Sequence, residues 1–242
     1  MIEPPDQIRR LVYLGTPDLA VPPLLALHEA GFDIALVVSR ADKRRGRGVG
    51  LSPSPVKSAA MRLGIPVSAD VDAVLEVGAD LGVVVAFGRL IKPHVLDRLA
   101  MVNLHYSLLP RWRGAAPVER AILAGDATTG VCVMRVVDEL DAGDIYRVED
   151  VPIDPDETLD ALRGRLTDIG TQLLIDALRS GLGTPEPQVG ETVYAHKIEA
   201  GELRLDWDRP AVEIHRVIRL GDAWTTSRGK RLKVWAARVV DD

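Results

Sequence analysis

The sequence predicts an α/β protein, with a mostly parallel sheet flanked by helices and a small β-rich appendage at the carboxyl end. Between residues 10 and 180, short apolar segments rich in Val and Leu alternate with segments of helical periodicity. That alternation is typical of strand–helix–strand units, which build parallel sheets. After about residue 201 the pattern changes to a short helix followed by a strand, which predicts the appendage.

The first strand–helix–strand unit sets the character of the sheet. A strand over residues 10–14 turns at Gly15, a helix capped by Asp18 runs to about residue 30, and a second strand covers residues 32–38. The turn has one glycine rather than the spaced set of a dinucleotide fingerprint. We therefore expect a Rossmann-like sheet without a nicotinamide cofactor.

The remaining elements follow in the same alternation. Proline favours the first turn of a helix, and glycine favours the residue after its end, so Pro117 and Gly181 mark helix boundaries. The expected elements are helices over 56–63, 93–99, 117–124 and 158–180, and strands over 81–86, from about 99 to 105, over 131–137 and over 145–151.

Three regions are expected along the chain. Residues 1–184 form the main domain and residues 185–204 form a linker, because the run Thr184-Pro185-Glu186-Pro187 at their boundary has a linker-like composition. Residues 205–242 form the appendage, with a helix near 211–220 and a strand near 232–239.

Composition limits the class of protein. A chain of 242 residues with 47% hydrophobic residues can bury a substantial core. The single cysteine, Cys132, excludes an internal disulfide and lies in an apolar strand, so we expect a buried, inert thiol. The amino terminus lacks a signal-peptide pattern, and no apolar run reaches membrane-spanning length. These features predict a cytoplasmic protein.

Charge is unevenly distributed. The formal net charge of −5 argues against indiscriminate binding of nucleic acids. Two basic groups nevertheless predict local polyanion sites, and either group alone is also compatible with a solvated loop. The two groups are Arg40, Lys43, Arg44, Arg45 and Arg47 in the loop over 40–55, and Arg228, Lys230, Arg231 and Lys233 near the end of the chain.

A polar pair ends one buried strand. Asn103 and His105 are two residues apart, so in an extended strand their side chains project from the same face. Polar groups near a strand end are often only structural, but this is also where open α/β folds place their chemistry. An acidic turn, Asp138–Asp144, follows a later apolar strand, and one of its carboxylates could orient the histidine.

Four segments in order carry a family resemblance. They are Gly15-Thr16-Pro17-Asp18, then Arg45-Gly46-Arg47-Gly48 leading to Pro53-Ser54-Pro55-Val56-Lys57, then Val85-Ala86-Phe87-Gly88, and finally Asn103-Leu104-His105-Tyr106-Ser107-Leu108-Leu109-Pro110 with its extension Arg111-Trp112-Arg113-Gly114-Ala115-Ala116-Pro117. Together they resemble the formyltetrahydrofolate-dependent formyltransferases, and the extension resembles their methionyl-tRNA branch. The resemblance covers residues from about 10 to about 239, and relative to that branch the carboxyl domain over 205–242 is shortened and lacks the usual Asn-Pro-Trp-Pro run.

The resemblance implies a reaction and a set of residues. It implies transfer of a formyl group from 10-formyltetrahydrofolate to the amino group of initiator methionyl-tRNA, by direct acyl transfer without a metal. The implied catalytic residues are Asn103, His105 and Asp141. The implied folate-binding residues are Phe87, Gly88, Ser107, Leu108, Leu109, Pro110, Asp138 and Glu139. The implied tRNA-binding residues are Arg44, Arg45, Arg47, Arg111 and Arg113.

The residue types suit that chemistry. Acyl transfer to an amine needs a donor for the developing oxyanion and an acceptor for the amine proton. Asn103 and a protonated His105 are such donors, and Asp141 would stabilise the imidazolium or take the proton. The few histidines show no metal-ligand spacing. Two alternatives remain open: formylation of a nucleotide-linked amino sugar, and a non-catalytic module that binds folate or tRNA.

Overall fold

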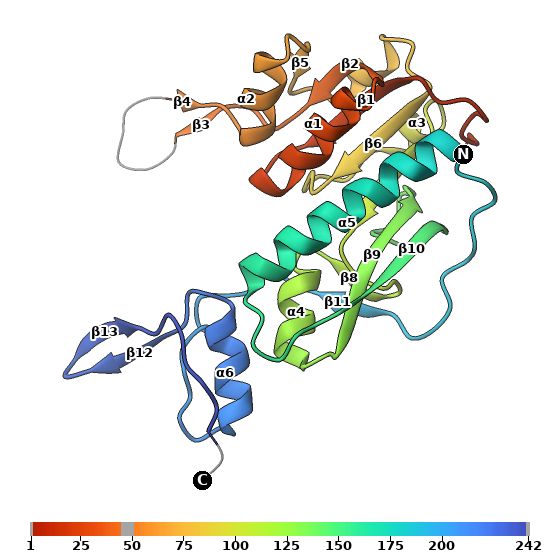
Figure 1. Ribbon diagram of the computed structural model, residues 1–242. Helices are drawn as coiled ribbons and strands as arrows, with labels where there is room; N and C mark the ends of the chain where they lie inside the picture. Colours follow the sequence, from red (N-terminus) through yellow and green to blue (C-terminus); the bar gives the residue numbers. More distant parts are fainter. Residues whose placement is uncertain (1, 45–50, 241–242) are drawn as a thin grey trace.

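A mixed sheet of seven strands forms the centre of the molecule (Figure 1). The computed structural model describes residues 2–44 and 51–240. Five adjacent strands are parallel, and at one edge β9 pairs antiparallel with both β7 and the edge strand β10. In spatial order the strands are β10 (Ile145–Pro152), β9 (Thr128–Arg135), β7 (Met101–His105), β6 (Leu81–Val85), β1 (Arg10–Gly15), β2 (Asp33–Val38) and β5 (Val67–Ser68). The predicted fold class is confirmed.

Helices pack against both faces of the sheet. One face shares a large apolar cluster with α1 (Val21–Glu29), α2 (Pro55–Arg62), α4 (Pro117–Ala124) and α5 (Leu159–Ser180). The other face shares a smaller cluster with α3 (Pro93–Leu96) and the 3₁₀ helix η2 (Asp72–Leu75). Helix α5 runs diagonally across its face of the sheet (Figure 1).

Strand β7 divides its side chains between these two faces. Val102 and Leu104 point into the cluster that contains α5, and Met101 points into the opposite one. Because side chains alternate along a strand, Asn103 and His105 lie on the face opposite α5. The strand pattern therefore places the polar pair where no long helix covers the sheet.

Most predicted elements appear within a few residues of the expected bounds. Helix α4 has the predicted bounds, and α5 begins after Thr158, whose hydroxyl accepts a hydrogen bond from the backbone N–H of Ala161. Ser54 caps α2 in the same way, through the N–H of Lys57. These caps satisfy N–H groups that the first helical turn leaves free.

The first helix was predicted to begin too early. Residues Asp18–Ala20 form a 3₁₀ turn, and α1 begins at Val21 with prolines in its first turn. Asp18 makes no capping hydrogen bond. Proline has no N–H and a fixed φ, so consecutive prolines suit the first turn of a helix, where no intrahelical partner is needed.

The carboxyl-terminal segment also differs from the prediction. Strand β12 (Trp224–Ser227) pairs with β13 (Lys230–Lys233) in a hairpin, and residues 234–240 form no strand. Arg228 and Gly229 both have positive φ, which is the geometry of a two-residue hairpin turn. Helix α6 (Ala211–Arg219) packs beside this hairpin, and the unit projects from the amino-terminal end of α5 (Figure 1).

Short strand pairs lie outside the main sheet. Strand β8 (Arg111–Gly114) pairs in parallel with β11 (Val193–Ala195). The long basic loop contains a small antiparallel pair, β3 (Lys43–Arg44) and β4 (Leu51–Ser52). Among the residues that the structure describes, no helix is long and apolar enough to cross a membrane.

Candidate active site on one face of β7

His105 has its two ring nitrogens in different environments. Nε2 lies 2.9 Å from the backbone oxygen of Trp112, and a carbonyl oxygen only accepts, so Nε2 carries a proton and donates it. Nδ1 lies 3.7 Å from Oδ2 of Asp141. The imidazole is 6% exposed. The contact to Trp112 therefore fixes the ring and leaves Nδ1 as the nitrogen that can exchange a proton.

Asp141 joins the two polar residues of β7. Its Oδ2 accepts a 2.8 Å hydrogen bond from the N–H of Gly114, and its Oδ1 lies 3.5 Å from the donor Nδ2 of Asn103. Its backbone has a φ of +49°, a conformation that costs an L-residue free energy and often occurs at functional sites. The structure thus brings together all three side chains that the sequence singled out.

The loop after β9 folds back over β7 to deliver this carboxylate. The N–H of Val136 donates to the oxygen of Met101, and the N–H of Arg135 donates to the oxygen of Asp144. At Gly143 an added Cβ would lie 2.0 Å from the oxygen of Arg135. The loop therefore needs a residue without a side chain at the point where its two ends meet.

The expected folate-binding residues divide into exposed and buried groups. Gly88, Asp138 and Glu139 are exposed and Leu108 is half-buried, so their surfaces are open to a ligand. Gly88 has a φ of +71° and open space where a Cβ would lie. The others are buried and support the local backbone: Phe87, Ser107, Leu109 and Pro110.

The loops after β6 and β9, the two neighbours of β7, carry apolar groups that the sequence analysis missed. Leu90 is 68% exposed and Leu140 is 45% exposed. Exposed leucines on loops are individually ordinary, so the sequence alone gave no reason to select them. What singles these two leucines out is that their loops lie on either side of β7. That position can be recognised only once the order of strands in the sheet is known.

Two of the expected tRNA-binding arginines are engaged within the protein. Arg111 forms a two-pronged ion pair with Asp126 and stacks over the ring of Trp112 at 4.3 Å, while 45% of its side chain stays exposed. Arg113 is buried and binds the side chains of Glu139 and Gln188. Arg45 and Arg47 lie outside the described residues, and for Arg44 only the backbone is described, in β3.

Cys132 is buried, as predicted. It pairs with His105 in the sheet register, and its Sγ lies 3.0 Å from the backbone oxygen of Ser107. Burial raises the pKa of the thiol to about 11. Because the thiolate is the nucleophilic form, this cysteine is a packing residue and not a catalytic one.

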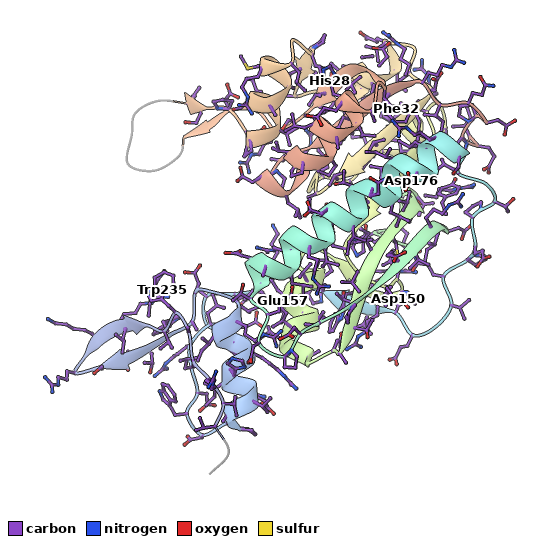
Figure 2. The ribbon with its side chains drawn as sticks, viewed as in Figure 1. His28, Phe32, Asp150, Glu157, Asp176 and Trp235 are labelled. Atoms are coloured by element: carbon purple, nitrogen blue, oxygen red, sulfur yellow. The ribbon has the colours of Figure 1, made fainter. Side chains whose placement is uncertain are left out.

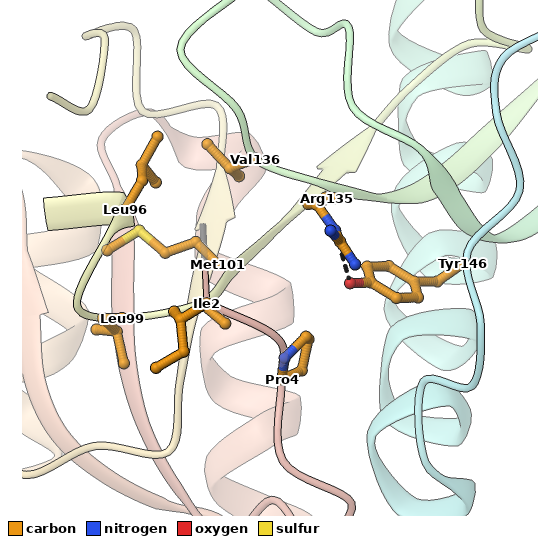
Figure 3. Close-up of a pocket in the computed structure, with 9 residues that line it drawn as sticks. Ile2, Pro4, Leu96, Leu99, Met101, Arg135, Val136 and Tyr146 are labelled. Atoms are coloured by element: carbon orange, nitrogen blue, oxygen red, sulfur yellow. Dashed lines mark hydrogen bonds between the residues drawn. The ribbon is translucent and has the colours of Figure 1, made fainter. Parts of the chain in front are cut away.

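Behind the acidic loop, the amino-terminal arm covers a small cavity (Figure 3). Its lining includes Ile2, Pro4 and Tyr146, and its volume is about 10 Å³, about enough for one water. Arg135 donates to the Tyr146 hydroxyl and forms an ion pair with Glu3 across this region. The arm therefore packs behind the site.

In the described parts of the chain, no three His, Cys, Asp or Glu side chains are grouped as metal ligands.

Sequence comparison identifies the family to which this fold and candidate site belong. Residues 9–178 match the family described as Formyl transferase, and residues 197–242 match Formyl transferase, C-terminal domain. The chain belongs to the formyl transferase family. It is 40% identical over 247 residues to a methionyl-tRNA formyltransferase of Heliobacterium modesticaldum, covering 95% of this chain and 78% of the relative. It is 45% identical over 246 residues to a methionyl-tRNA formyltransferase of Ruegeria pomeroyi, covering 95% and 82%.

Solved structures share the fold at low sequence identity. An N-formyltransferase from Helicobacter canadensis, in complex with folinic acid and dTDP-3-aminofucose, superposes with a TM-score of 0.70 at 17% identity, over 95% of this chain and 87% of that one. HypX from Aquifex aeolicus in complex with tetrahydrofolic acid gives 0.68 at 18% identity, over 93% and 37%.

Proposed function

We propose that this chain transfers a formyl group from 10-formyltetrahydrofolate to the amino group of methionyl-tRNA. The observation that carries the proposal is the convergence of Asn103, His105 and Asp141 on one face of β7. The named relatives at 40% and 45% identity, matched over 95% of this chain, support methionyl-tRNA as the acceptor. Translation initiation places this reaction in the cytoplasm, and the initiator tRNA is the expected form of the acceptor.

The reaction forms one C–N bond and breaks another. The neutral amine attacks the formyl carbon, the bond from that carbon to N10 of the folate breaks, and the proton lost by the amine is returned to N10. Negative charge develops on the formyl oxygen as the carbon becomes tetrahedral. Donors held in place before the reaction stabilise that charge without the cost of reorganisation.

The three side chains have complementary roles. The amide of Asn103 and Nδ1 of protonated His105 donate to the developing oxyanion, while the carbonyl of Trp112 holds the ring through Nε2. Asp141 orients His105 and receives the amine proton directly or through one water. Because no nucleophilic serine or thiolate is part of this cluster, the transfer is direct rather than through an acyl-enzyme.

The surroundings suit a folate donor. A pterin ring has apolar faces and hydrogen-bonding edges, so it needs apolar surface together with polar groups at its edges. The exposed backbone at Gly88 and the exposed side chains of Leu90 and Leu140 offer both on the loops after β6 and β9. Arg44, Arg45, Arg47 and Arg111 remain the proposed contacts to tRNA, and the exposed part of Arg111 is available for a phosphate. Arg113, which was also expected to contact tRNA, is buried and bound to Glu139 and Gln188, so its position favours a structural role.

A direct assay tests this function. The purified chain is incubated with 10-formyltetrahydrofolate labelled in the formyl group, and with either methionyl-tRNA or a panel of nucleotide-linked amino sugars. Label transferred to methionyl-tRNA and not to the sugars supports the proposal. Transfer only to an amino sugar assigns the alternative acceptor, and transfer to neither identifies a binding module without activity.

A further inference from the structure

Gln188 bridges the catalytic loop and the buried arginine of β8, although it lies in the segment that was expected to be a linker. Its Nε2 donates to the backbone oxygens of Asp141 and Gly143, both at 2.8 Å. Its Oε1 accepts from Nε and Nη2 of Arg113, at 3.0 and 2.8 Å. A guanidinium only donates and a carbonyl only accepts, so these partners fix the orientation of the amide and use its full hydrogen-bonding capacity.

The tip of the acidic loop depends on contacts from other segments to hold its shape. Asp138, Glu139 and Leu140 are exposed, and Asp141 adopts an unfavourable positive φ. A strained conformation persists only where surrounding contacts over-determine it. The two hydrogen bonds from Gln188 reach the peptide carbonyls on either side of Ala142, immediately after the carboxylate that faces His105.

The contacts form a closed circuit around the carboxylate. Arg113 holds Gln188, Gln188 holds the loop at Asp141, and Asp141 accepts from the N–H of Gly114, the residue after Arg113. If Gln188 moves, the distances from Asp141 to Gly114 and to His105 are therefore expected to change. The guanidinium of Arg113 also pairs with Glu139 on the same loop, at 3.1 Å.

The backbone on both sides of Gln188 is fixed to the catalytic domain. Glu186 exchanges two 2.8 Å hydrogen bonds with Ile145, and the N–H of Val193 donates to the oxygen of Pro110. The oxygen of Ala195 accepts from the N–H groups of Ala115 and Ala116, at 2.9 and 3.1 Å. This segment, residues 186–195, leads directly into the carboxyl-terminal unit that begins near residue 197.

We infer that Gln188 is a positioning residue for Asp141, and that the segment over 186–195 is a structural part of the catalytic centre. The expected effect on kcat rests on the proposed formyl transfer. The expected effect on the acidic loop does not depend on it. Gln188 does not touch the reacting groups. It acts by holding the loop that places Asp141 against Gly114 and His105.

The first test is hydrogen exchange and needs no substrate. Gln188→Met keeps the length of the side chain and removes its hydrogen bonds. We expect faster amide exchange at Gly114 and over the loop 138–143, with exchange in the parallel strands unchanged. Gln172→Met is the matched control, because Gln172 is exposed on α5 and its Nε2 donates to Asp176 of the same helix. Unchanged exchange at Gly114 in Gln188→Met would overturn the inference.

The second test uses kinetics in two backgrounds. Gln188→Met should lower kcat about tenfold, with KM for donor and acceptor within about twofold, because a displaced carboxylate affects the chemical step. In an Asp141→Asn background the same change should cost less than about twofold, since groups that act through one another are not additive. An equal loss in both backgrounds, or a loss confined to KM, would contradict positioning through Asp141.

A third variant separates the two halves of the bridge. Gln188→Glu keeps the acceptor for Arg113 but replaces the two N–H donors with a carboxylate facing two carbonyl oxygens. We expect it to be as slow as Gln188→Met, and wild-type turnover would refute the role of the Nε2 contacts. If the wild-type chain formylates no acceptor while the exchange result holds, the proposed function fails and the positioning of Asp141 by Gln188 stands.

Discussion

His105 uses its two ring nitrogens for different tasks, and the division follows from hydrogen-bond chemistry. The carbonyl of Trp112 accepts a hydrogen bond from Nε2–H, which leaves Nδ1 facing Asp141. Trp112 has a φ of +69°, so the strand that supplies this carbonyl is itself held in an unfavourable conformation. One backbone group therefore sets both the tautomer and the orientation of the imidazole.

The first residue-scale prediction concerns the cluster on β7. His105→Ala and Asp141→Asn should each lower kcat for formyl transfer by about a hundredfold or more, because each removes a group that exchanges a proton or stabilises the oxyanion. Single-turnover transfer to methionyl-tRNA measures the change. His94→Ala is the control, since His94 forms a half-exposed pair with Asp72 at 2.9 Å. Near-normal turnover in Asp141→Asn would contradict the assigned role.

The second residue-scale prediction concerns Cys132. Its pKa is raised to about 11 from a reference of 9.0 because burial disfavours the thiolate. A raised pKa in the folded state means that the contribution to stability is complete below pH 9 and is lost as the pH rises towards 11. At pH 8 we expect iodoacetamide to modify Cys132 only after denaturation, as measured by intact mass. Rapid modification of the folded chain would show that the thiol is accessible.

At the scale of elements, the parts that local signals define were predictable. Pro117 marks the start of α4, and Thr158 caps α5. The return of the loop after β9 onto β7 was not predictable, because it depends on contacts from Gly114 and Gln188, which are distant in sequence. The sequence thus indicated which residues form the candidate site, but not the circuit that holds them.

Helix α5 offers an element-scale prediction with an internal control. Gly164 lies on its exposed side, with open space where a Cβ would lie, whereas a Cβ at Gly170 would lie 3.1 and 3.3 Å from the methyl groups of Leu104. Alanine has a higher helix propensity than glycine, so Gly164→Ala should raise the free energy of unfolding by up to about 1 kcal/mol.

In Gly170→Ala the same gain in propensity is opposed by crowding against β7, which costs about 1–3 kcal/mol in packed cores. We therefore expect no net stabilisation, or a loss, in this variant. Urea denaturation of the two variants measures the difference. A similar increase in both would mean that α5 is not packed closely against Leu104 at Gly170.

At the scale of the whole molecule, polar contacts and the packing of Leu220 against the main core join the carboxyl-terminal unit to the catalytic domain. The unit has a small core of its own, formed by Leu205, Ile218 and Ala223. Arg120 forms an ion pair with Glu202 and lowers the pKa of that carboxyl. Figure 2 shows Glu157, at the start of α5, close to α6. The position of this unit relative to the active site therefore depends on individual side chains.

Arg219 is the main such side chain on α6, and it carries the whole-molecule prediction. Its guanidinium is buried and donates to the backbone oxygens of Glu157 and Asp154, at 2.7 and 3.0 Å, and burial lowers its pKa. Arg219→Met should weaken docking by about 2 kcal/mol, because hydrogen bonds from charged groups contribute more than neutral ones.

With so small a core, the carboxyl-terminal unit should open locally before the sheet unfolds. In Arg219→Met we expect faster proteolysis and faster amide exchange over residues 205–233, with unchanged exchange in β1 and β6. Arg209→Met is the matched control, since Arg209 is exposed and pairs with Glu213 within the same unit. Because this unit carries the basic group Arg228, Lys230, Arg231 and Lys233, the variant should also raise KM for methionyl-tRNA more than it lowers kcat. Cooperative unfolding of the sheet and the carboxyl-terminal unit together would instead show that Arg219 supports the whole fold.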